Sequence, residues 1–179
     1  MRIIRGELGG RRLVYSSKLK SRPTTDFARE GVFNLLESRI DFDGIDFLDL
    51  FAGTGCIGFE AYSRGAHVVG VDVDIWSQRG ILDIVKDWGL DRYRFHRADV
   101  FRFLKKVYQK QFDVVFADAP FSFPTTLKLP DLVLEGKWLK PGGLLVIEHG
   151  KDKDFSKHPK FDSSRSFGNV IFSFFNQDS

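Results

Sequence analysis

Between residues 45 and 149 the chain alternates short apolar runs with stretches of helical character, and this alternation restricts the fold more than any other feature. The apolar runs occupy residues 45–51, 67–72, 93–99, 112–118 and 143–149. The helix-like stretches between them occupy residues 56–65, 74–88, 101–110 and 129–139. This pattern is typical of a parallel sheet covered on both faces, so we predict an α/β fold. Residues 167–175 follow a turn-rich, charged stretch and predict one more strand, which returns antiparallel at an edge.

The length and composition fit a single domain that is large enough to fold without disulfide bonds. The chain has 179 residues, about the size of one domain, and contains no internal repeat or low-complexity linker. Cys56 is the only cysteine, which excludes an intrachain disulfide. No apolar stretch approaches the roughly 18 residues needed to cross a bilayer, and the N-terminus lacks the apolar centre of a secretory signal. We therefore expect a cytoplasmic protein without a membrane partner.

The first thirty residues carry most of the positive charge. Against three acids they hold eight basic residues: Arg2, Arg5, Arg11, Arg12, Lys18, Lys20, Arg22 and Arg29. This balance is +5 and the net charge of the whole chain is +3, so the remainder is near −2. Gly9-Gly10 predicts the turn of a basic β-hairpin. The asymmetry is consistent with a polyanion-binding face or with a solvated basic tail.

This charge pattern suggests two parts of the chain. We predict a basic hairpin and arm over residues 1–22 and a main domain over residues 23–179. The main domain opens with a helix within residues 27–40, where apolar residues recur at helical spacing. Thr25 or Asp26 is suited to cap the N-terminus of this helix.

Carboxylates stand at or near the ends of four successive predicted strands. Asp49 lies within the first, and Asp72, Asp99 and Asp118 follow the second, third and fourth. In open α/β sheets, ligands bind outside the carboxyl ends of the strands, so these four side chains can converge on one crevice. A loop-capping role is the simpler explanation for any one of them, but the recurrence favours a shared site.

The sequence LDLFAGTGCIG, residues 48–58, joins the first strand to the first helix of the sheet through a loop with almost no side-chain bulk. Gly53 and Gly55 let a ligand approach the backbone there. With Gly58 they match the dinucleotide fingerprint, and Asp72 lies near the distance expected for an acid that binds a ribose hydroxyl. Nicotinamide and sulfonium cofactors both contain an adenosine, so this motif does not separate them.

The fourth strand ends in Asp118-Ala119-Pro120-Phe121, which suits methylation of an exocyclic amine on a nucleobase. The amine lone pair is delocalised into the ring. The Asp118 carboxylate and the Ala119 carbonyl can accept its two N–H bonds and turn the lone pair toward a methyl group. Pro120 holds Ala119 extended, and Phe121 offers a ring on which an extruded base can stack. The alternative is an ordinary turn after a strand.

LDLFAGTG and DAPF together resemble class I S-adenosylmethionine-dependent methyltransferases that modify amino groups of nucleobases. The segments MRIIRGELGGRRL, RPTTDFAREGVFNLL and SRGA extend the resemblance over nearly the whole chain to the 16S ribosomal RNA guanine-N2 methyltransferases of the small subunit. The resemblance implies a Rossmann-like, mostly parallel seven-stranded sheet with helices on both faces, in the order 3-2-1-4-5-7-6. It also implies S-adenosyl-L-methionine as cofactor, with the following residues around its methionine end: Asp49, Phe51, Gly53 and Gly55.

By the same resemblance, Asp72 binds the ribose hydroxyls, Asp99 and Val100 border the adenine, and residues 118–121 hold the guanine. We expect the phosphates of ribosomal RNA, in the small subunit or an assembly intermediate, to be bound by five residues: Arg2, Arg5, Arg11, Arg12 and Arg22. The four histidines and Cys56 lack metal-ligand spacing, so no metal site is expected. We expect a monomer.

One residue departs from the family pattern. The family tetrapeptide usually carries two prolines, and here the first is replaced by Ala119, which keeps the carbonyl but loses rigidity. Two further functions stay open. One is an adenine-N6 or cytosine-N4 methyltransferase acting on DNA or other RNA, and the other is a catalytically silent RNA-binding assembly factor.

Overall fold

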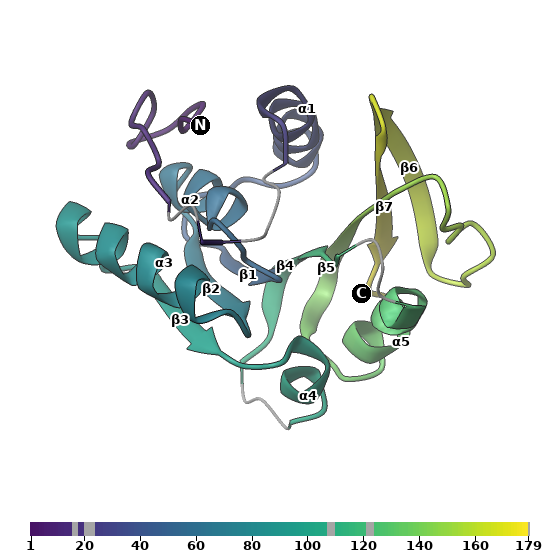
Figure 1. The fold of residues 1–179 in the computed structure, drawn as a ribbon. Coiled ribbons are helices and arrows are strands. Elements are labelled where there is room, and N and C mark those ends of the chain that lie inside the picture. Colours follow the sequence, from purple (N-terminus) through teal and green to yellow (C-terminus); the bar gives the residue numbers. More distant parts are fainter. Residues whose placement is uncertain (16–17, 20–23, 107–109, 121–123, 179) are drawn as a thin grey trace.

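The computed structural model contains a seven-stranded sheet with helices on both faces (Figure 1). It describes residues 1–15, 18–19, 24–106, 110–120 and 124–178. The strands are β1 Asp46–Leu50, β2 His67–Asp72, β3 Tyr93–Arg97, β4 Phe112–Asp118, β5 Leu139–His149, β6 Phe161–Phe167 and β7 Val170–Asn176. The helices are α1 Asp26–Glu37, α2 Cys56–Ser63, α3 Ile75–Trp88, α4 Val100–Leu104 and α5 Leu129–Leu134, with the 3₁₀ helix η1 at Pro124–Lys128.

The strand order is β3-β2-β1-β4-β5-β7-β6, which confirms the order implied by the family resemblance. β3, β2, β1, β4 and β5 are parallel to one another, whereas β7 is antiparallel to both β5 and β6. The order reverses direction at β1, since β2 lies on one side of it and β4 on the other. The carboxyl ends of β1 and β4 therefore border the crevice in which open α/β sheets bind ligands.

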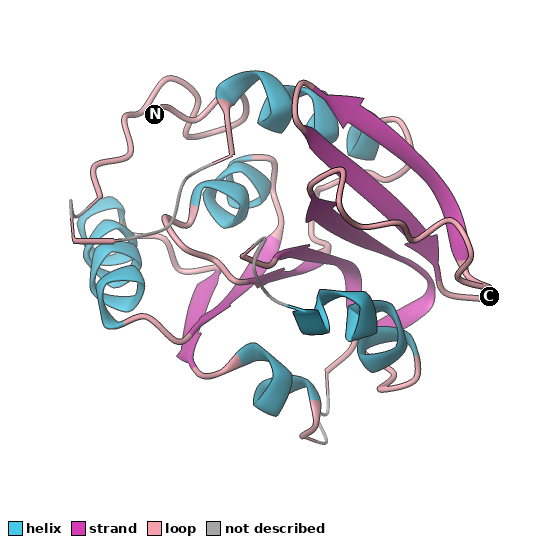
Figure 2. Cartoon of the chain, turned by 45° about the vertical axis from the view of Figure 1, so that its right-hand side comes forward, coloured by secondary structure: helices cyan, strands magenta, loops and turns pink. Residues whose placement is uncertain are grey.

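Two apolar layers enclose the sheet, with α1, α2 and α3 packed on one face and α4 and α5 on the other (Figures 1 and 2). Along β4, Val114 and Phe116 belong to the first layer, and Val115 and Ala117 belong to the second. Successive side chains of a strand point to opposite faces, so a strand covered on both sides must be apolar throughout. No helix among the described residues is long and apolar enough to span a membrane.

Polar side chains cap the helices that begin near the carboxyl edge. The Thr25 hydroxyl accepts a hydrogen bond from the Ala28 amide at the start of α1, as predicted. Asp74 caps α3 in the same way. These caps satisfy backbone donors that have no partner within the helix.

Three elements differ from the prediction. α4 ends at Leu104, although the sequence predicts helical character as far as residue 110. α5 ends at Leu134, and residue 139, predicted as helical, already belongs to β5. β6 lies in the charged stretch that the sequence predicts as turns. It is an edge strand whose polar residues stay largely exposed, and its pairing with β7 uses backbone groups, so apolar periodicity gives no signal for it.

The first thirteen residues fold back on themselves, as predicted, although the regular pairing among the described residues is one antiparallel bridge between Arg2 and Arg12. Ile3, Leu8 and Leu13 are buried in the same apolar layer as α1 and α2. The predicted division between residues 22 and 23 falls outside the described residues and stays a prediction.

Candidate functional site

The glycine loop after β1 has an unusual backbone. Gly53 and Gly55 have φ angles of 52° and 77°, in the left-handed region that glycine adopts without steric cost. Phe51 also lies there, with φ of 62°, which is strained for a residue with a bulky side chain. Cys56 then begins α2, and burial raises the pKa of its thiol to about 11.

Asp49 lies beneath this loop and ties it to the sheet. Its Oδ2 accepts a 2.9 Å hydrogen bond from the Gly58 amide in the first turn of α2. A side chain at Gly58 would place its Cβ 3.0 Å from that oxygen and 2.5 Å from the Tyr93 hydroxyl oxygen, so only glycine fits. The pKa of Asp49 is raised to about 8: burial is the largest cause, the Gly58 hydrogen bond opposes it, and the nearby charge of Asp72 adds to the rise.

Asp72 ends β2 beside the same loop. One carboxylate oxygen accepts from the Gly53 amide and the other from the Asp74 amide, both at 2.8 Å. Burial raises its pKa, and these two backbone donors lower it. Each oxygen keeps a second lone pair, so the fixed carboxylate can still accept the hydroxyls of a ribose. The acceptor oxygens of Asp72 at this strand end therefore fit the ribose hydroxyls of an adenosine-containing cofactor.

The residues predicted at the adenine also lie at a strand end, immediately after β3. Asp99 is exposed and its carboxylate caps α4 through the Arg102 amide at 2.9 Å. Val100 is buried. The next residue, Phe101, places its ring edge-on to Phe51 with 5.9 Å between ring centroids, which joins the start of α4 to the glycine loop. The contacts of these residues with adenine stay a prediction.

The tetrapeptide begins at the end of β4, directly beside the glycine loop. Ala117 is in register with Leu50, so Asp118 and Phe51 leave this point of the sheet side by side. Asp118 ends the strand and is half-buried, Ala119 is buried and Pro120 is exposed. Phe121, the predicted stacking ring, lies outside the described residues.

Asp118 has a strongly perturbed environment. Burial raises its pKa well above the usual range of an aspartate, and the negative charges of Glu148 and then Asp49 raise it further. Perturbed carboxylates in a crevice at strand ends are typical of functional sites, although structural networks perturb them as well. No three metal-binding side chains within the described ranges are grouped closely enough to hold an ion.

Glu148 is a residue of this region that the sequence analysis does not select. It lies near the end of β5, in register with Asp118, and its Oε2 accepts a 2.8 Å hydrogen bond from the Thr24 hydroxyl. It follows the apolar run 143–147 in the way that Asp118 follows its own run, so the same strand-end signal could have found it. The bond to Thr24 joins segments far apart in the chain and has no sequence signal.

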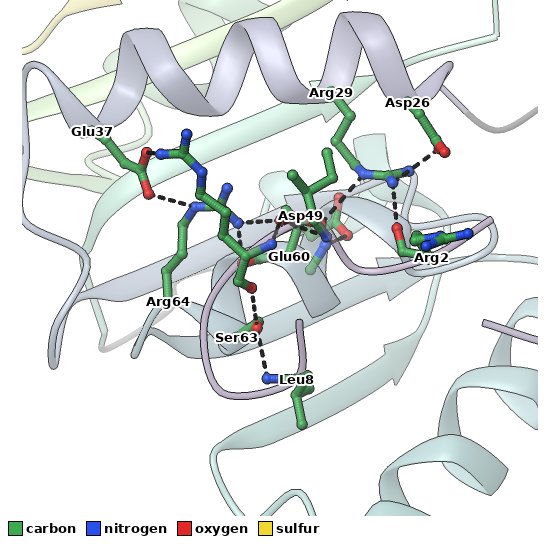
Figure 3. A network of polar contacts seen from close by, with 12 residues as sticks. Arg2, Leu8, Asp26, Arg29, Glu37, Asp49, Glu60, Ser63 and Arg64 are labelled. Carbon is green, nitrogen blue, oxygen red and sulfur yellow. Dashed lines mark hydrogen bonds and ion pairs between the residues drawn. The ribbon is translucent and has the colours of Figure 1, made fainter. Parts of the chain in front are cut away.

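The predicted RNA-binding residues are held on the N-terminal segment, which a buried ionic network fixes to α1 and α2 (Figure 3). Glu60 is fully buried, accepts the amides of Ile4 and Arg5, and forms an ion pair with the Nε of Arg29 at 3.4 Å. Arg29 also donates a 2.6 Å hydrogen bond to the Arg2 carbonyl. Arg29 counts toward the basic cluster of the sequence, but it is buried and paired, so it does not belong to the exposed basic face.

The exposed arginines of this segment have different surroundings. Arg5 forms an ion pair with Glu37 at 3.5 Å, and the Arg11 guanidinium lies 5.1 Å from the centre of the Trp88 ring. Arg2 and Arg12 are exposed, and neither forms an ion pair with the part of the chain that is described. Arg22 lies outside the described residues.

A surface hollow borders the basic segment above α3. Asp83 and Asp87 also line it, and five of its ten lining residues are cationic or aromatic: Arg12, Tyr15, Trp76, Arg79 and Trp88. Aromatic rings interleaved with cations suit a single-stranded nucleic acid, because bases stack on the rings while phosphates meet the cations. The hollow lies beside α3, which starts just after Asp72, rather than in the crevice between β1 and β4.

The strand order, the glycine loop and the acids at the strand ends define a Rossmann-like fold of the class I, S-adenosylmethionine-dependent methyltransferase type. The chain belongs to the family described as "Conserved hypothetical protein 95", which matches residues 1–176. It is 36% identical over 162 residues to the Ribosomal RNA small subunit methyltransferase D of Haemophilus influenzae, covering 86% of this chain and 80% of that protein.

Two further comparisons agree with this placement. The "Putative rRNA methyltransferase YlbH" of Bacillus subtilis is 34% identical over 156 residues, which cover 85% of this chain and 84% of that protein. The solved structure of the "Putative methyltransferase yhhF" of Escherichia coli matches with a TM-score of 0.86 at 26% identity, over 100% of this chain and 98% of the other. The resemblance inferred from the sequence motifs is therefore confirmed.

Proposed function

We propose that this protein methylates the exocyclic N2 of a guanine in the 16S RNA of the small ribosomal subunit. The observation that carries the proposal is the position of Asp118, at the end of β4 and beside the glycine loop that follows β1. This brings the predicted amine-binding residues next to the predicted cofactor loop. The names of the relatives support ribosomal RNA as the substrate. They do not specify the modified atom, so N2 of guanine is part of the proposal.

The cofactor, S-adenosyl-L-methionine, supplies a methyl carbon made electrophilic by the positive sulfur beside it. Asp72 holds the ribose hydroxyls, and the bare backbone of residues 53–55 lets the methionine end approach the sheet. Asp49 holds the loop in place through Gly58. The exposed arginines of the N-terminal segment bind RNA phosphates, and the ionic network around Glu60 keeps that segment fixed before RNA arrives.

At the reacting atom, Asp118 accepts one N–H of the guanine amine, and the Ala119 carbonyl accepts the other. This orients the nitrogen lone pair toward the methyl carbon. With the cofactor bound, the sulfur–carbon bond would break as N2 gained the methyl group, and the Asp118 carboxylate would take the amine proton. The positive sulfur and the one N–H that Asp118 accepts favour the ionised form of Asp118, which opposes the rise in its pKa caused by burial.

The direct test uses methyl-labelled cofactor with three substrates: unmodified 30S particles, free 16S RNA and DNA. We expect label in ribosomal RNA, and nucleoside mass spectrometry should identify it as N2-methylguanosine. Label found in N6-methyladenosine or N4-methylcytidine would replace the proposal with the corresponding alternative. Binding of cofactor and RNA without any methyl transfer would instead identify an assembly factor.

A further inference from the structure

Glu148 stands beside Asp118 at the carboxyl edge of the sheet, and the mechanism above does not use it. The two residues are partners in the register of β4 and β5. In-register residues of neighbouring parallel strands point to the same face, and the strands lie about 4.8 Å apart. Both carboxylates therefore face the side of the sheet that α1 and α2 cover. Asp49 faces the same side, because its register partner Phe116 lies two residues before Asp118.

The surroundings of Glu148 are unusual for a carboxylate with a purely structural role. Its side chain is 3% exposed, and the Thr24 hydroxyl is its one hydrogen-bond donor among the described residues. No lysine, arginine or histidine in those ranges forms an ion pair with it. A buried carboxylate without a cation lowers stability, and an apolar residue or an amide would tie α1 to the sheet at less cost.

We propose that Glu148 is a specificity-determining residue of this site, whose Oε1 accepts the N1–H of the guanine while Asp118 holds the N2 amine. This inference rests on the proposed function. The Watson–Crick edge of guanine presents N1–H and the N2 amine as neighbouring donors, so two carboxylates on adjacent strands match them. A purine with a bare N1 presents a lone pair at the same place, which an ionised carboxylate repels.

Thr24 is the matching positioning residue. It precedes Thr25, the N-cap of α1, so its hydroxyl is fixed by the helix start and holds Oε2 of Glu148. This leaves Oε1 for the base. Burial raises the pKa of Glu148 to about 7, and the Thr24 hydroxyl lowers it, so this donor favours the ionised form that accepts N1–H.

The test compares two particles reconstituted with guanine or with 2,6-diaminopurine at the mapped target position. Diaminopurine keeps the 2-amine and has an acceptor at N1. We expect the wild-type protein to prefer guanine by 100-fold or more in kcat/KM. Glu148→Gln can donate its amide N–H to a bare N1, so the preference should fall at least tenfold. Asp118→Asn, the matched control, should slow both substrates and keep the preference.

Thr24 provides a second pair of variants that leave Glu148 in place. Thr24→Val should lower the preference for guanine, and Thr24→Ser, which keeps the hydroxyl, should restore it. If Glu148→Gln is folded and keeps the wild-type preference, the inference is wrong even though the wild type forms N2-methylguanosine. If Glu148→Gln fails to fold, the Thr24 variants decide. An equal preference for guanine in Thr24→Val and Thr24→Ser would then overturn the inference. Failure of the wild type to form N2-methylguanosine would instead overturn the proposed function.

Discussion

At the scale of single residues, Asp72 carries the cofactor proposal. Its two oxygens are fixed by the Gly53 and Asp74 amides, so the carboxylate is preorganised for the ribose. Asp72→Ala should weaken S-adenosyl-L-methionine binding by about 2 to 4 kcal/mol, since charge-assisted hydrogen bonds are lost and two hydroxyls are left unpaired. Calorimetry measures this, with Asp83→Ala, an exposed change on α3, as control. Unchanged cofactor affinity in Asp72→Ala would show that Asp72 only stabilises the loop and does not bind the ribose.

Asp49 makes the stability of the protein depend on pH. Its pKa is raised to about 8 in the folded state and is near 3.9 in the unfolded state, so stability present at acid pH is lost as the pH rises through this range. Asp49→Asn removes the cost of ionisation and keeps an oxygen for the Gly58 amide. Without cofactor, the variant should be more stable than the wild type at pH 8, by about 3 kcal/mol or more.

Urea unfolding at several pH values measures this difference. It should shrink as the pH falls and disappear below about pH 3, where the wild-type carboxyl is protonated in both states. Curves that run parallel from pH 4 to pH 9 would show that Asp49 keeps an ordinary pKa in the folded protein.

At the scale of elements, the network around Glu60 joins three segments: the N-terminal segment, α1 and α2 (Figure 3). Arg29→Ala should lower the free energy of unfolding by about 3 kcal/mol, because it removes the buried partner of Glu60 on α1 while Arg64 stays paired with Glu60. Arg39→Ala is the control, since Arg39 is partly exposed and pairs with Asp162 at 2.8 Å. It should cost about 1 kcal/mol or less. An equal loss of unfolding free energy in the two variants would show that the network stabilises the protein no more than a surface ion pair does.

The elements also show what the sequence could and could not predict. β1, β2, β4 and β5 are predictable because each has an apolar run covered on both faces, and Asp72 and Asp118 are predictable because they end such runs. β6 is not, since an exposed edge strand needs no apolar pattern. Glu60 is buried against two arginines. Arg64 lies four residues further along, at helical spacing, whereas Arg29 is distant in the chain and has no signal in the helical periodicity.

At the scale of the whole molecule, the N-terminal segment and the sheet have separate tasks. Replacing Arg11 and Arg12 with Ala should weaken RNA binding and flatten its salt dependence by about one unit of slope per lost phosphate contact. Cofactor affinity should stay the same, because Asp72 and the glycine loop are untouched. Filter binding across a salt series measures both affinity and slope. RNA binding equal to wild type at every salt concentration would identify the segment as a solvated tail.

The central claim is that Asp118 orients a base amine for methyl transfer, and single-turnover kinetics of Asp118→Ala test it most directly. Removing one preorganised polar group at a reacting centre typically costs 10²- to 10³-fold in rate. We expect the rate of N2-methylguanosine formation on 30S particles to fall by about this factor, with cofactor affinity and the unfolding midpoint close to wild type. A folded Asp118→Ala protein that binds cofactor and methylates guanine at the wild-type rate would contradict the account.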